Sequence, residues 1–172
     1  MIKETLLNAS LLLISLIIFF WYKWYTKKHY GLKGSISASA DDLKKEGKQF
    51  YTYFFVVIGL CFPLAWIAQT WLTTIAVGLM SCIGIITGYN DRLKNYKFQH
   101  VLHVILAFIP IAIFMAGIII EINVMYAYLI GTFVILSIWL VVKKTPDYVR
   151  KIEDLAYYCI CMCLILERII LL

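Results

Sequence analysis

Six apolar segments, each close to the length that crosses a lipid bilayer, fill most of this 172-residue chain. A transmembrane helix needs about 20 residues to cross ~30 Å of hydrocarbon. The segments do not alternate in hydrophobicity, as the strands of a membrane β-barrel would, so they are expected to be helices. The sequence predicts one all-α domain, a polytopic transmembrane bundle with spans at about 5–22, 50–68, 71–88, 98–120, 124–142 and 155–172.

The composition excludes an ordinary water-soluble domain. Hydrophobic residues make up 63% of the chain and charged residues 15%, whereas soluble domains carry roughly 45–50% and about 25%. The first apolar run lacks a small-x-small cleavage site and is followed by its positive charges, so we interpret it as an uncleaved span. All five cysteines fall in predicted spans, which argues against a disulfide framework.

The basic residues are confined to alternate loops. All Lys and Arg residues other than Lys3 and Arg168 lie in the first, third and fifth loops, and the two short turns between them carry none. The positive-inside rule then makes residues 23–49 a cytoplasmic loop and places both termini outside. We expect a multi-pass protein of the cell membrane whose basic face contacts anionic headgroups. No basic stripe with interleaved aromatics remains for nucleic acid.

One pair of small residues predicts close helix packing. Gly84 and Gly88 have the G-x-x-x-G spacing that lets two helices approach closely. The pair can serve an intramolecular packing face or a homo-oligomer contact. Pro63 and Pro110, each inside a span, predict kinks.

The loop after the first span contains Ser35, Ser37 and Ser39 within the stretch Gly-Ser-Ile-Ser-Ala-Ser. This stretch resembles a motif of small bacterial six-span membrane proteins of unknown function. The resemblance implies the same architecture and a bacterial inner membrane, and it implies no activity. The tyrosines expected after Ser37 and Ala38 in that motif are replaced here.

A second cluster has the residue types of a metal site. His100 and His103, three residues apart on a helix, would share one face near Asp91. Two imidazoles and a carboxylate could hold zinc and leave a position for water. The cluster loosely resembles the alkaline ceramidase and adiponectin receptor type of membrane hydrolase, which has seven spans and a further histidine pair in the last one. The last span here has no histidine, so no catalytic residue is assigned.

Three charged residues are expected to form an ion-pair cap at the outer face. Glu121 lies in a predicted outer turn, and Glu167 with Arg168 lies near the end of the last span. Charges are costly at the bilayer centre but cheaper near its surface. The expected pairs are Arg168 with Glu121 and Glu167 with Lys3.

Three functions follow from these features. The favoured one is a non-enzymatic membrane subunit that contacts lipid or binds a partner through its basic cytoplasmic face, with no cofactor. The second is a metal-dependent lipid hydrolase at the inner interface. The third is an oligomeric channel or membrane-disrupting effector whose subunits meet at Gly84 and Gly88. A transport path is not expected, because the middles of the spans hold few polar residues.

Overall fold

The computed structural model describes residues 2–31, 43, 46–48, 59–85, 96–144 and 147–170, with the backbone alone for 2, 81–85, 96–104 and 106–107. Within these residues the protein is all-helical, as predicted, and contains no strand. The α-helices are α1 (Ile2–Tyr30), α4 (Phe62–Ala68), α5 (Trp71–Ile85), α6 (Tyr96–Gly117), α7 (Ala127–Val142) and α8 (Tyr148–Ile165). Two π-helical segments, η2 (Ile118–Ile122) and η4 (Leu166–Ile170), extend α6 and α8, and a 3-10 turn, η3 (Val124–Tyr126), precedes α7.

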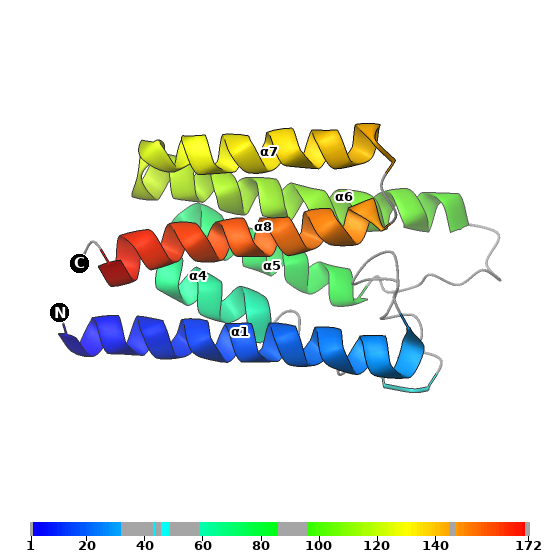
Figure 1. Ribbon diagram of the computed structural model, residues 1–172, viewed down its shortest axis with the longest axis horizontal. Coiled ribbons are helices and arrows are strands. Elements are labelled where there is room, and N and C mark those ends of the chain that lie inside the picture. The colour runs from blue at the N-terminus through cyan, green and yellow to red at the C-terminus, as the bar shows by residue number, and fades with distance from the viewer. Residues whose placement is uncertain are drawn as a thin grey trace.

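The helices lie side by side along the long axis of the molecule (Figure 1). α1 lies along one side, α4 and α8 lie next to it, and α6 and α7 lie on the other side. Both chain ends lie at one end of the bundle, together with the turns that join α4 to α5 and α6 to α7. The connection from α7 to α8 lies at the opposite end.

Two helices extend beyond the spans expected from hydropathy. α1 continues past Tyr22 to Tyr30, and α8 begins at Tyr148 instead of Leu155. Both additions are rich in charged residues, which are good helix formers but do not register as apolar. Pro63 lies in the first turn of α4, directly after the π-helical residues 59–61. Pro110 lies inside α6.

The turn between α4 and α5 is formed by two residues. Gln69 adopts a left-handed conformation (φ 54°) and donates its N–H to the carbonyl of Ala65, 2.9 Å away, which ends α4. The Thr70 hydroxyl accepts from the N–H of Thr73 at 3.2 Å, which caps the start of α5. The tight turn predicted at these two residues is thus explained by their capping hydrogen bonds.

Asn123 forms the other turn at this end. Its N–H donates to the carbonyl of Ile118 at 2.9 Å and closes η2. Its Oδ1 accepts from the N–H of Met125 at 2.9 Å and caps η3. Asparagine favours this position because its short side chain reaches the free N–H groups of the next helix.

Helices α5 and α6 approach each other closely at Gly117. A Cβ added to Gly117 would lie 3.0 Å from the Cβ of Leu72 and 3.2 Å from the hydroxyl of Thr70. The absence of a side chain at Gly117 therefore permits this contact. The Gly84/Gly88 pair predicted to pack closely is described only in part. Gly84 lies in α5 with its backbone alone described, and Gly88 lies outside the described residues.

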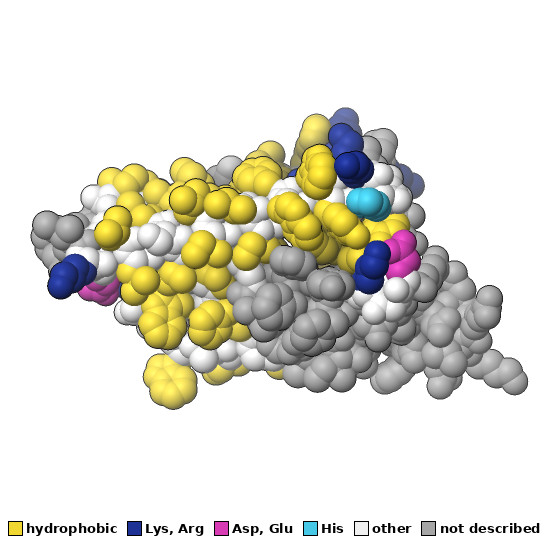
Figure 2. All heavy atoms as spheres, turned by 90° about the horizontal axis from the view of Figure 1, so that it is seen from below, with side chains coloured by type: hydrophobic (Ala, Val, Ile, Leu, Met, Phe, Trp, Pro, Cys, Tyr) yellow, Lys and Arg dark blue, Asp and Glu magenta, His cyan; other side chains and the backbone are white. Residues whose placement is uncertain are grey.

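Two described helical segments are long and apolar enough to cross a membrane, Lys3–Tyr30 and Val124–Val142. Their apolar stretches are buried for only 28% and 11% of their residues. Apolar side chains are spread over the described part of the face that Figure 2 presents; Lys and His side chains gather toward one end, and Lys and acidic side chains also lie at the other. The described segments Gly59–Ala68, Trp71–Met80 and Phe108–Ile122 are apolar but shorter.

Candidate functional site

The residues predicted for a metal site are placed by backbone alone or not at all. His100 and His103 lie in the first half of α6, three residues apart on one helix, as predicted. Their side chains and Asp91 lie outside the described part of the structure, and so do Ser35, Ser37 and Ser39. Both the metal site and the loop motif therefore stay predictions.

The three residues predicted as an outer cap lie at the end of the bundle that holds the chain termini. Each of the three side chains forms a hydrogen bond with a group other than the charged residue with which it is expected to pair. Glu121 Oε2 accepts from the N–H of Leu72 at 3.2 Å, and Glu167 Oε2 accepts from the hydroxyl of Tyr126 at 2.9 Å. Arg168 Nη2 donates to the carbonyl of Ala68 at 3.1 Å.

The contacts of Glu121 and Arg168 cap helix ends that would otherwise lack partners. Leu72 lies in the first turn of α5, where backbone N–H groups are free, and the carbonyl of Ala68 lies in the last turn of α4. A carboxylate at a helix start and a guanidinium at a helix end also match the helix dipole. Among the residues described, Glu121 and Arg168 thus bind backbone groups at helix ends, and Glu167 binds the hydroxyl of Tyr126.

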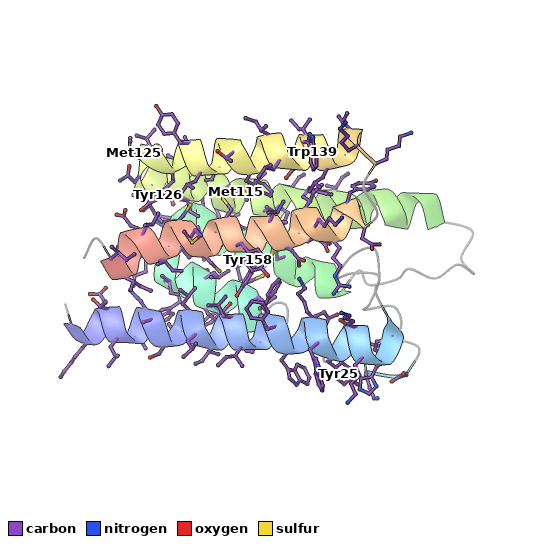
Figure 3. The ribbon with its side chains drawn as sticks, viewed as in Figure 1. Tyr25, Met115, Met125, Tyr126, Trp139 and Tyr158 are labelled. Carbon is purple, nitrogen blue, oxygen red and sulfur yellow. The ribbon has the colours of Figure 1, made fainter. Side chains whose placement is uncertain are left out.

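Sequence reasoning missed a polar seam between α1 and α8. The hydroxyls of Ser15 and Tyr157 lie 2.8 Å apart and both residues are buried. The ring of Phe19 stacks on that of Tyr157, with centroids 4.1 Å apart. Tyr158, also on α8, lies on the side that faces α1 (Figure 3) and meets Phe19 edge-on at 5.6 Å.

An ion pair continues the seam toward the end of the bundle that holds the α7–α8 connection. Lys23 Nζ lies 2.5 Å from Asp154 Oδ2, and the two side chains are 25% and 18% exposed. The same ammonium lies 5.2 Å from the centre of the Phe19 ring. Asp154 Oδ1 is buried and has no hydrogen-bond partner in the described structure.

The spacing of the seam on α1 was visible in the sequence. Ser15, Phe19 and Lys23 follow one another at four-residue intervals and therefore share one helix face. Their partners on α8, 131 and 142 positions away, could not be identified from spacing. The seam joins the first and last helices by a buried hydroxyl pair, an aromatic stack and an ion pair.

No protein-family model, curated protein or solved structure matches the chain in comparisons with known proteins. Any function must therefore be argued from the residues themselves.

Proposed function

We propose that the protein is a multi-pass integral membrane protein that works as a non-enzymatic, lipid-contacting subunit with a basic cytoplasmic face. The outer surface of α7 carries this proposal. The segment Val124–Val142 is long enough to cross a bilayer and only 11% of its apolar stretch is buried. Ile135, Ile138 and Val142 are 68%, 58% and 71% exposed. Exposing such a surface to water would cost a free energy of about 25 cal/mol per Å² of apolar area.

The charges at the ends of the described helices support an orientation of the proposed six-span bundle with its basic end inside. Lys143 and Lys144 follow α7 directly, and Lys27 and Lys28 lie in the last turn of α1. The chain termini lie at the opposite end of the bundle (Figure 1). Basic residues at one end favour the cytoplasmic side for that end, and we propose the bacterial inner membrane on the resemblance of the serine motif.

Photolabelling with a diazirine-bearing phospholipid tests the proposal on the unmodified protein. In vesicles, labels should form on α7 at Ile135, Ile138 and Val142. Ile130 and Leu140 of the same helix are 7% and 8% exposed, and they should stay unlabelled. Mass spectrometry of the α7 peptides reads out the pattern.

Two outcomes would overturn the proposal. Absence of label on every helix would mean that the chain does not lie in the bilayer. Label on α1 with none on α7 would mean that another protein covers α7, which favours a partner-binding subunit in place of a lipid-contacting one.

A metal-dependent lipid hydrolase is the second candidate. The observation that favours it is that α6 includes both His100 and His103, so the two residues lie on one helix face. Elemental mass spectrometry of the detergent-purified protein tests it. The hydrolase predicts near-stoichiometric zinc that is lost in His100→Ala/His103→Ala and kept in His29→Ala, a control on the exposed face of α1. Equal metal content in all three proteins would remove this candidate.

A further inference from the structure

α1 is longer than a bilayer requires. Its 29 residues span about 43 Å at 1.5 Å per residue, against ~30 Å of hydrocarbon. The apolar run ends at Tyr22 and Lys23 follows. In the proposed membrane orientation, the segment from Trp21 to Tyr30 therefore lies at the depth of the lipid headgroups, where tryptophan and tyrosine are enriched.

Aromatic rings line this segment in a continuous row. The rings of Trp21 and Tyr25 stack with centroids 5.3 Å apart, and the rings of Tyr25 and His29 lie 4.4 Å apart. Tyr25 extends away from the bundle (Figure 3). The four-residue spacing continues the row toward the membrane centre through Ile17 and Leu13, each 58% exposed. One helix face thus changes from aliphatic to aromatic at the expected membrane surface.

A neighbouring row on α1 ends in a cation. Phe20 and Trp24 are 54% and 56% exposed, and Lys28 Nζ lies 4.8 Å from the centre of the Trp24 ring. This cation–π contact holds the ammonium along the helix. Lys27 lies beside it, and among the described residues no carboxylate pairs with Lys27 or Lys28.

The described acid of the 46–48 turn does not cancel these charges. Glu46 pairs with Lys48, with Nζ and Oε2 2.8 Å apart. The donated hydrogen bond lowers the pKa of the Glu46 carboxyl, so the pair is ionised and neutral overall at pH 7. Lys27 and Lys28 therefore remain the unpaired cations of this described surface.

We propose that this face of α1, formed by Trp21, Trp24, Tyr25, Lys27 and Lys28, is a binding site for an anionic phospholipid. The site rests on the proposed function, since it needs α1 in a bilayer. The two ammonium groups donate charge-assisted hydrogen bonds to the headgroup phosphate. The acyl chains lie on the aliphatic side chains of Leu13 and Ile17 and on the ring of Phe20. A zwitterionic choline headgroup is disfavoured because its trimethylammonium would meet the two lysines.

Tryptophan quenching by brominated lipids tests the site. In a background with Trp66, Trp71 and Trp139 each replaced by Phe, the remaining tryptophan fluorescence comes only from Trp21 and Trp24. Brominated phosphatidylglycerol should bind beside them about 30-fold better than brominated phosphatidylcholine, because each of the two lysines adds roughly a fivefold preference for an anionic headgroup. Lys27→Gln/Lys28→Gln should reduce this preference to about one, and Lys27→Arg/Lys28→Arg should keep it.

Lys143→Gln/Lys144→Gln is the matched control, because both lysines are exposed at the end of α7 and the variant removes the same charge. It should leave the preference unchanged. An equal loss in both glutamine variants would show diffuse attraction in place of a site and would overturn the proposal. A background protein that shows no preference between the two lipids would overturn it as well. Phospholipid photolabels on α7 would in either case leave the proposed function standing.

Discussion

At the scale of single residues, the Lys23–Asp154 pair is the least expected feature. The sequence predicts both residues to lie in loops, because hydropathy marks only where apolar stretches end. In the structure both lie in helices, with side chains 25% and 18% exposed. Removing charges this far from water is costly, and it is compensated only while both partners are present. The sequence could not reveal the pair, since no local pattern relates positions 131 apart.

Asp154→Asn should lower the free energy of unfolding by about 1–3 kcal/mol, because Lys23 keeps its charge and loses its acceptor. The double variant Lys23→Met/Asp154→Leu should recover much of this loss. Denaturant unfolding in detergent micelles, followed by circular dichroism, measures both. A double variant no more stable than Asp154→Asn would show that the loss does not come from leaving Lys23 without its acceptor.

At the scale of helices, hydropathy predicted the helix ends at Ala68, Trp71, Val124 and Val142 but not the charged extensions of α1 and α8. The turn at Gln69 and Thr70 was predicted and is formed by their capping hydrogen bonds. The extent of α1 and α8 was missed because charged helical turns have no apolar signature. Gly117 was missed as well: it has no small partner four residues away, and its close neighbours come from another helix.

Gly117→Ala should destabilise the protein by about 1–3 kcal/mol, since its new methyl would meet the Cβ of Leu72, an atom fixed to the backbone of α5. Gly131→Ala in α7 is the control, because a Cβ there meets nothing within 4 Å. It should be neutral or stabilising by up to about 1 kcal/mol from helix propensity. Thermal unfolding of both variants provides the comparison, and similar shifts would contradict a tight α5–α6 contact at Gly117.

At the scale of the whole molecule, the described helices place both chain ends together (Figure 1). The sequence predicts that this end lies outside the cell, from charge alone. Alkaline phosphatase fused after Leu172 should therefore be active, and the same enzyme fused after Lys144 should be inactive. Green fluorescent protein at these two positions should give the opposite pattern. An active fusion after Lys144 would place the basic end outside and reverse the proposed orientation.

The polar cap has a consequence for how the protein is made. Arg168, in the last turns of the chain, donates to the carbonyl of Ala68 at the end of α4, and Glu167 accepts from Tyr126 before α7. Chains emerge from the ribosome N-terminal end first. The segments that contain Ala68 and Tyr126 are therefore synthesised before the two residues of η4 that join them. A nascent chain that stops before Glu167 has both partners but neither contact, so this end of the described bundle can form only after residue 168 has been added.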